Sequence, residues 1–299
     1  MQVARLASKD GIILTRGHRS LNKQVVKGII RALAPQCLVN WYHRMGGRSV
    51  CFVGTYPGWQ AAEKDATGYN AEAILQLVVE KTKLVVSGKV AYERDGVVFD
   101  EPAYPYPLLA LLLRAAAANN NRLTVLDFGG SLGSTYRQCQ AFLRGVSTLK
   151  WCVVEQRHYV DAGNTHFADE VLSFHESIAA ASCDQQPNVV LFSSVLQYLP
   201  EPYAALEEAI SRQPDYIVID RTPFLDAGNS VLSLQIVPKN IVKASYPVWL
   251  FNEQTLKRVF VGRYVEIATF AAIDGTLGHG RLSATFKGVM LEKVNEKPD

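Results

Sequence analysis

Cysteine is scarce and dispersed in this chain of 299 residues, which carries five cysteines, at positions 37, 51, 139, 152 and 183. No Cys-x-x-Cys pair and no cluster of cysteine with histidine occurs, which excludes a zinc-binding motif. An odd number of scattered cysteines favours reduced thiols over a disulfide framework. We therefore expect a cytoplasmic protein without structural zinc.

Long apolar runs are also missing. No run reaches the roughly 18 residues of a transmembrane helix, and the first residues, with Asp10 and Arg16, lack the apolar core of a signal peptide. The hydrophobic fraction of 48% nevertheless allows one large core, or a core and a smaller lobe. These features indicate a soluble protein inside the cell.

The net charge of +3 conceals a local excess of positive charge. Residues 1–48 hold nine of the 31 Lys and Arg residues but only one of the 28 Asp and Glu residues. Their spacing predicts an amphipathic helix with apolar positions Leu21, Val25, Ile29 and Leu33 and basic positions Lys23, Lys27 and Arg31. This helix either packs on the protein's own core or makes peripheral contact with an anionic membrane. Because interleaved aromatic residues are lacking, we expect no nucleic-acid partner.

An apolar stretch from Val125 runs through Asp127 into a glycine-rich turn that ends at Gly133. Glycine is required where a turn takes positive φ and a ligand lies against the backbone, and a helix that starts there offers free N–H groups. A second apolar stretch ends in Glu155, which is placed to accept hydrogen bonds from both hydroxyls of a ribose. Two such strand ends predict a nucleotide-type site.

Two common nucleotide motifs are incomplete here. The dinucleotide motif requires glycines at relative positions 1, 3 and 6, but the glycines stand at 129, 130 and 133, with serine where glycine is required. A phosphate loop requires Gly-Lys-Ser/Thr, and no lysine lies between Val125 and Leu149. The spacing therefore weakens the NAD interpretation and excludes a P-loop.

The remaining pattern resembles motif I of the class I methyltransferases that depend on S-adenosyl-L-methionine (SAM). In that family an acid at a strand end precedes a glycine-rich turn, and a second acid ends the next strand. The resemblance implies SAM as the cofactor, with Asp127, Gly129, Gly130, Gly133, Tyr136 and Glu155 as its binding residues. The structural alternative is that the glycines only form a tight turn between strand and helix.

From Leu123 onward the pattern alternates between strand and helix, with strands expected at 123–128, 149–154, 170–174, 188–192 and 215–220. Such alternation predicts a parallel sheet covered by helices. Two final runs, Tyr264–Ile273 and Leu282–Val294, are joined by a glycine-rich turn and predict an antiparallel hairpin.

This α/β arrangement resembles the Rossmann-like, seven-stranded methyltransferase sheet. It divides the chain into a basic N-terminal arm (1–48), an N-terminal helical lobe (49–120) and a SAM-binding methyltransferase domain (121–299). Within the lobe, 51–68 is expected to be rich in turns, and the RDG sequence at 94–96 to form a polar turn.

Ligands of open α/β sheets bind at the carboxyl ends of the strands. By the same resemblance, His175 or Glu176 after the third strand lies near the adenine, unless both belong to a solvated loop. Ser193 and Ser194 after the fourth strand line the methyl-transfer centre. Serines offer no carboxylate for a divalent metal, so we expect no metal. The motifs of base methyltransferases are absent as well, which makes a nucleic-acid base a poor acceptor.

Methyl transfer to a hydroxyl requires alignment of the two substrates and removal of a proton. The loop between the last two strands is expected on the ligand side, which makes His279 a candidate base, with a solvated histidine as the alternative. Asp220 and Tyr198 are further candidate bases, unless Asp220 only caps a turn, and the neighbouring Arg221 is another alternative for this role.

The segment 222–252 is too long for an ordinary connection. It contains the aromatic run SYPVWLF at 245–251. We expect a lid that forms aromatic walls around an acceptor together with Tyr104 and Tyr106, or aromatic residues that anchor the segment to the core.

A second resemblance reaches into the N-terminal lobe. It rests on GTYPGW at 54–59, TGYNAEAIL at 67–75, YERDGVVF at 92–99 and LDFGGSLGSTY at 126–136. These segments are similar to an uncharacterised bacterial methyltransferase family found among surface-polysaccharide biosynthesis genes. The resemblance implies O-methylation of a glycan, a glycolipid or another small-molecule acceptor. The alternative is a catalytically silent SAM-fold protein that serves as a scaffold in an assembly near the membrane.

Overall fold

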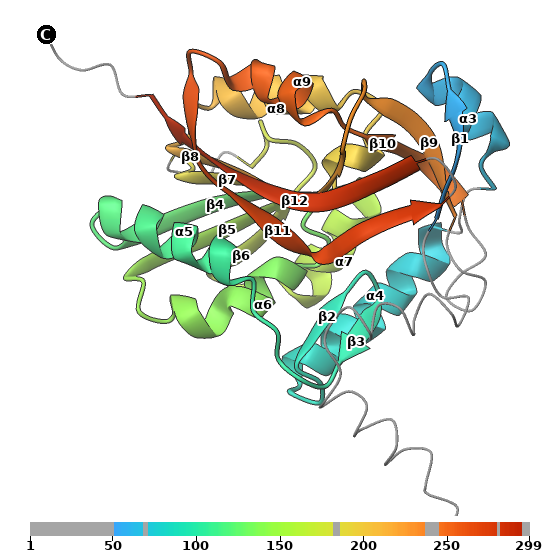
Figure 1. Ribbon diagram of the computed structural model, residues 1–299. Helices are drawn as coiled ribbons and strands as arrows, with labels where there is room; N and C mark the ends of the chain where they lie inside the picture. Colours follow the sequence, from blue (N-terminus) through green and yellow to red (C-terminus); the bar gives the residue numbers. More distant parts are fainter. Residues whose placement is uncertain (1–50, 68–70, 182–185, 237–244, 280–281, 295–299) are drawn as a thin grey trace, which may run out of the picture. The chain divides into compact units, whose positions relative to one another are not determined.

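The computed structural model describes residues 51–67, 71–181, 186–236, 245–279 and 282–294 (Figure 1). They belong to a compact unit that extends from Ser49 to Asp299. The predicted basic arm and its amphipathic helix lie outside the described residues. Among the helices in the described ranges, none is long and apolar enough to cross a membrane.

Seven strands form the central sheet, in the order β11-β12-β8-β7-β4-β5-β6. Their bounds are Arg122–Phe128 (β4), Thr148–Val154 (β5), Leu172–His175 (β6), Val189–Ser193 (β7), Tyr216–Leu225 (β8), Tyr264–His279 (β11) and Leu282–Lys293 (β12). The strands β4 to β8 run parallel to one another, whereas β12 is antiparallel to both β8 and β11. The predicted parallel sheet with a terminal antiparallel hairpin is therefore confirmed.

Alternate residues of the central strands enter two hydrophobic cores, one on each face of the sheet, because successive strand side chains point to opposite faces. On β4, Val125 belongs to the first core and Leu126 to the second. The helices of the first core are α4 (Ala71–Val86), α5 (Tyr106–Ala118), α6 (Ser134–Leu143) and α7 (Arg157–His166). Those of the second are α8 (Pro202–Ser211) and α9 (Glu253–Lys257) (Figure 1).

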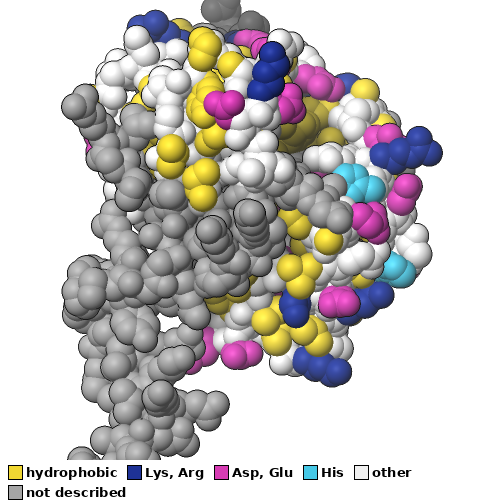
Figure 2. All heavy atoms as spheres, turned by 90° about the vertical axis from the view of Figure 1, so that its right-hand side faces the viewer, with side chains coloured by type: hydrophobic (Ala, Val, Ile, Leu, Met, Phe, Trp, Pro, Cys, Tyr) yellow, Lys and Arg dark blue, Asp and Glu magenta, His cyan; other side chains and the backbone are white. Residues whose placement is uncertain are grey.

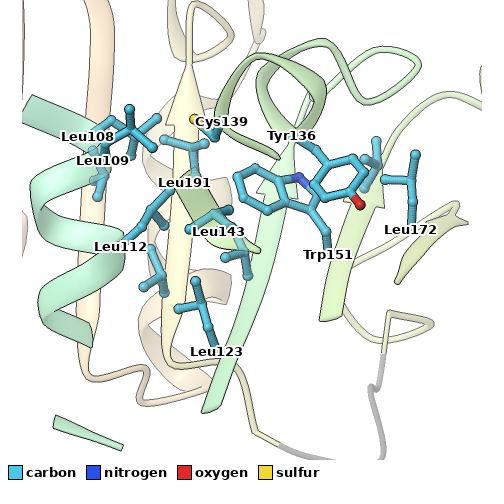
Figure 3. Packing of buried hydrophobic residues seen from close by; sticks show 14 of the residues in the cluster. Leu108, Leu109, Leu112, Leu123, Tyr136, Cys139, Leu143, Trp151, Leu172 and Leu191 are labelled. Carbon is cyan, nitrogen blue, oxygen red and sulfur yellow. The ribbon is translucent and has the colours of Figure 1, made fainter. Parts of the chain in front are cut away.

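Trp151 on β5 lies within the first core and is fully buried. Figure 3 shows its indole beside the ring of Tyr136 from α6, with leucines of α5 nearby on the same face. A large aromatic residue at this position fills the space between the sheet and two helices.

The described parts of the segment expected as a lid are largely strands. Two of its parts form β9 (Val231–Ile236) and β10 (Ser245–Leu250), and both belong to a second, three-stranded antiparallel sheet. The third strand of that sheet is β1 (Cys51–Tyr56), which lies in a region expected to be rich in turns and is followed by α3 (Trp59–Asp65). The N-terminal lobe therefore contains strands as well as helices.

A short hairpin completes the lobe. Its strands β2 (Tyr92–Arg94) and β3 (Val97–Phe99) flank the predicted turn. Asp95 and Gly96 form this turn with φ of 53° and 77°, a conformation that a tight hairpin turn requires. The hairpin extends from the lobe toward α6, which it contacts through Glu93 and Arg94.

Two of the cysteines differ in their bonding. Cys139 on α6 is a buried, free thiol, and Cys152 on β5 is disulfide-bonded. The expectation that the cysteines are reduced is therefore wrong for Cys152. The spacing of dispersed cysteines carries no information about which of them the fold brings together.

Two neighbouring leucines of α5 test the position of the first core. Leu112 is fully buried in it (Figure 3), whereas Leu113 is 41% exposed. We expect Leu112→Ala to lower the free energy of unfolding by about 2 to 5 kcal/mol, because it leaves a cavity. Leu113→Ala should change it by less than about 0.5 kcal/mol. Urea denaturation measures both, and equal losses would contradict the assigned orientation of the helix.

Candidate functional site

The carboxyl ends of the parallel strands meet at one edge of the sheet, where three non-glycine residues have a positive φ. Ser131 after β4, Ser194 after β7 and Arg221 within β8 have φ of 54°, 58° and 51°. Non-glycine residues rarely adopt positive φ, which costs energy that the surrounding structure must offset. Positive φ also occurs before β4 and β8, at Asn120, Asn121 and Gln213, so the site is located by its side chains and glycines as well as by its backbone.

The turn after β4 depends on its three glycines. Gly129 and Gly133 have φ of 73° and 83°, and Gly133 is the N-cap of α6. A Cβ on Gly129 would lie 2.4 Å from Val195 Cγ2, and one on Gly130 would lie 2.5 Å from Asp127 Oδ2. Both distances are too short for side chains, so the backbone here stays bare and can approach a ligand closely.

Asp127, at the end of β4, is a buried carboxylate that is only half satisfied. Its Oδ2 accepts a hydrogen bond from Trp151 Nε1 at 2.9 Å, while its Oδ1 is buried without a partner in the described structure. Burial, and then the charge of Glu155, raises the pKa of Asp127 to about 7. An unpaired buried carboxylate oxygen is costly unless a donor or a cation approaches it.

Glu155 follows β5, at the neighbouring strand end. Its Oε1 accepts a hydrogen bond from the Ser131 backbone N at 3.3 Å, and its Oε2 accepts one from the Gln156 backbone N at 2.9 Å. Burial raises the pKa of Glu155. The carboxylate is thus fixed beside the glycine-rich turn, and each oxygen can accept a further hydrogen bond.

The next strand end places two predicted residues differently. His175 lies partly buried at the end of β6, where its Nε2 is 2.9 Å from Ser173 Oγ, and burial lowers its pKa. Glu176 is exposed. Of these two residues, His175 is the one that the structure holds in place.

Ser193 and Ser194 lie beside the end of β8. Ser193 is paired in register with Asp220, and the Ser194 backbone N donates to the Asp220 carbonyl oxygen at 3.0 Å. Gln197 Nε2 donates to Ser194 Oγ at 3.2 Å and to the Arg221 carbonyl oxygen at 3.3 Å. This buried amide therefore holds together two of the strained residues.

Tyr136 is placed in the first core. It is 3% exposed, its ring centroid lies 5.6 Å from that of Trp151 (Figure 3), and its hydroxyl accepts a hydrogen bond from Gln140 Nε2 at 3.3 Å. Its position therefore suits support of α6 rather than ligand contact. Tyr104 and Tyr106 both pack on Phe142 of α6, with ring centroids 4.9 and 6.3 Å away.

The three candidate bases have different surroundings. Asp220 is 5% exposed, its Oδ1 accepts from the Arg221 backbone N at 2.8 Å, and burial raises its pKa. Tyr198 donates from its hydroxyl to Gln235 Oε1 at 3.1 Å, and burial raises its pKa to about 12. The backbone of His279 pairs with that of Leu282 near the turn of the β11–β12 hairpin, and its side chain lies outside the described structure.

Sequence reasoning missed an ion cluster at this edge. Arg221 donates to Asp274 Oδ2 from Nε at 2.9 Å and to Asp274 Oδ1 from Nη2 at 3.0 Å. Its Nη2 also donates to Asp95 Oδ2 at 3.1 Å. The available signal was the charged YERDGVVF segment, in which Glu93 and Arg94 end β2 and Asp95 begins the turn.

The buried Asp127 makes the stability of the fold depend on pH. Because its folded-state pKa is raised from 3.8 to about 7, the stability that it contributes is fully present below the unfolded-state pKa and is lost as pH rises through about 7. Asp127→Asn keeps an oxygen for Trp151 and removes the titration. We expect its stability relative to the wild type to increase between pH 4 and pH 7, by up to about 4 kcal/mol.

Urea denaturation at a series of pH values measures this difference. The exposed Asp161 provides the control variant, Asp161→Asn, which should follow the wild type at every pH. Parallel curves for Asp127→Asn and the wild type would show that the carboxyl does not titrate in this range.

No family model matches the sequence, and no curated protein matches it. Among solved structures, the 1,6-didemethyltoxoflavin-N1-methyltransferase of Burkholderia thailandensis is 13% identical, covers 81% of this chain and 95% of its own, and gives a TM-score of 0.43. The N-terminal domain of EvdMO1 is 14% identical, covers 72% of this chain and 97% of its own, and gives a TM-score of 0.44. An amino pentose methyltransferase from Micromonospora echinaspora is 11% identical, covers 62% of this chain and 90% of its own, and gives a TM-score of 0.40. At identities of this size the similarity concerns the fold.

Proposed function

We propose that this chain is a SAM-dependent methyltransferase of class EC 2.1.1. The observation that carries the proposal is the pairing of the glycine-rich turn with Glu155 at adjacent carboxyl ends of this sheet. The strand order, with an antiparallel β12 between β8 and β11, is the arrangement that the resemblance to class I methyltransferases implies.

The residues at this edge fit SAM. The backbone of Gly129, Gly130 and Gly133 is bare where a cofactor would pass, and Glu155 is fixed where it can accept from ribose hydroxyls. The unpartnered Oδ1 of Asp127 suits a cationic group, and SAM carries an ammonium and a sulfonium. When bound, SAM supplies an electrophilic methyl group.

The remaining residues take supporting positions in this proposal. His175, with Glu176 beside it, borders the adenine side of the site, and Ser193 and Ser194 border the methyl-transfer side. Tyr136 supports the glycine-rich turn from within the core. We further propose that the reaction needs no metal, because Ser193 and Ser194 at the end of β7 offer no carboxylate ligand.

For the acceptor we propose a hydroxyl of a glycan, a glycolipid or another small molecule. The support is the second sequence resemblance and the presence of a buried carboxylate, Asp220, at the methyl-transfer side. Asp220 is our preferred base because its raised pKa makes it a stronger proton acceptor than an ordinary aspartate. Tyr198 and His279 remain the alternatives.

The proposed location is the cytoplasm, with peripheral contact at the inner face of the membrane through residues 1–48. The disulfide of Cys152 is uncommon in that compartment and counts against this part of the proposal. On the face seen in Figure 2, acidic and basic side chains of the described residues are interspersed. The support for membrane contact is the charge and spacing of residues 1–48.

Cofactor binding tests the proposal directly. We expect SAM and S-adenosylhomocysteine to bind, and Glu155→Gln to weaken both by ~1.5 to 3 kcal/mol through loss of charge-assisted hydrogen bonds. Gly130→Val should weaken them further, because its side chain would collide with Asp127. Titration calorimetry measures the affinities, with the exposed Glu201→Gln as control. Binding of NAD in place of SAM would overturn the proposal.

The base is tested by transfer of a labelled methyl group to a fractionated pool of glycans and glycolipids. Asp220→Asn should lower the rate by about 10²- to 10⁴-fold while cofactor affinity stays unchanged. The wild-type rate should fall as pH falls through the raised pKa of Asp220, because the protonated carboxyl accepts no proton. Asp215→Asn, at the other end of β8, is the control. SAM binding without any transfer would instead favour a scaffold.

A further inference from the structure

The β2–β3 hairpin contacts α6 at two residues one helical turn apart. Glu93 Oε2 accepts a hydrogen bond from Ser134 Oγ at 2.6 Å, and Arg94 donates from Nη2 to Gln138 Oε1. Positions four apart lie on one face of a helix. Since α6 begins directly after Gly133, the hairpin covers the helix at the end of the glycine-rich turn.

Arg94 forms no hydrogen bond with a carboxylate among the described residues, although acids surround it. Asp95 and Asp274 bind Arg221, and Asp220 accepts from the Arg221 backbone. The adjacent Glu93 accepts from Ser134 and from the Gly96 backbone N at 2.8 Å. The acids nearby are thus engaged elsewhere.

Within the described part of the chain, this arrangement leaves a partly buried guanidinium with an amide oxygen as its hydrogen-bond acceptor. Burial, and then the positive charge of Arg221, lowers the pKa of Arg94, and the charges of Asp95, Asp274 and Asp220 raise it without overcoming these two effects. An anion placed directly against the guanidinium would offset the remaining penalty.

Arg94 and Asp127 lie on the two sides of the turn that joins β4 to α6. Asp127 stands near the end of β4, before the turn, and Arg94 donates to Gln138 on α6, after it. Among the described residues, Asp127 presents a carboxylate oxygen without a partner and Arg94 a cation without a carboxylate partner. Charges of opposite sign therefore flank the glycine-rich turn, as a zwitterionic amino acid requires.

We propose that Arg94 binds the carboxylate of the amino-acid part of SAM, so that the N-terminal hairpin forms one wall of the cofactor site. The inference rests on the proposed function. A guanidinium suits this role because its planar fork matches a carboxylate with two parallel hydrogen bonds. Glu93 acts as a positioning residue, since it ties the hairpin turn to the start of α6.

Two ligands that differ in the amino-acid part test the proposal by titration calorimetry on the full chain. S-Adenosylhomocysteine carries the carboxylate, and 5′-methylthioadenosine replaces the whole amino-acid chain with a methyl group. We expect Arg94→Met to weaken S-adenosylhomocysteine on the order of 10-fold or more and to change 5′-methylthioadenosine by less than about 2-fold. Arg94→Lys should recover part of the loss because it keeps the charge.

Arg114→Met is the control, because Arg114 pairs with Glu292 and is largely exposed. Equal weakening of both ligands by Arg94→Met would show a merely structural role and overturn the proposal. Unchanged affinity for S-adenosylhomocysteine with loss of methyl transfer would place the anion on the acceptor, which also overturns it. Failure of the wild type to bind either ligand would instead contradict the proposed function.

Discussion

The ion cluster of Arg221 determines how the carboxyl edge of the sheet is closed. Although burial alone would lower the pKa of Arg221, Asp95 and Asp274 raise it, so the guanidinium stays charged within the fold. Its side chain is 10% exposed, against 23% for Asp274 and 73% for Asp95. The two-point contact with Asp274 is thus the better shielded, and the contact with Asp95 is the weaker.

Three elements depend on this one side chain. Arg221 lies on β8, Asp274 on β11 and Asp95 in the turn of the β2–β3 hairpin. Loss of Asp274 would leave the buried cation without its two-point partner, which costs far more than the pair contributes when intact. The positive φ of Arg221 persists because the ion pairs with Asp274 and Asp95 fix the residue in place.

The parallel sheet and its first two strand ends could be predicted because their signals are local. An apolar run, an acid and a glycine-rich turn specify β4 and the start of α6 within a dozen residues. The second sheet could not be predicted in this way, since β1 pairs with β9 across about 180 residues. Tyr136 was assigned to ligand contact by its position near a helix start, but Trp151 on the neighbouring strand draws its ring into the core.

The second sheet also has a consequence for the order in which the chain folds. The strand β9 lies between β1 and β10, and β10 is a near neighbour in sequence, so this pair can form early. The addition of β1 must close a loop of about 180 residues, and its entropic cost is met only after the central sheet has brought the ends together. During synthesis β1, the first strand in the described part of the chain, thus waits longest for its partner, and Phe52 can join the small core with Val248 and Leu250 only after β9 and β10 have been made.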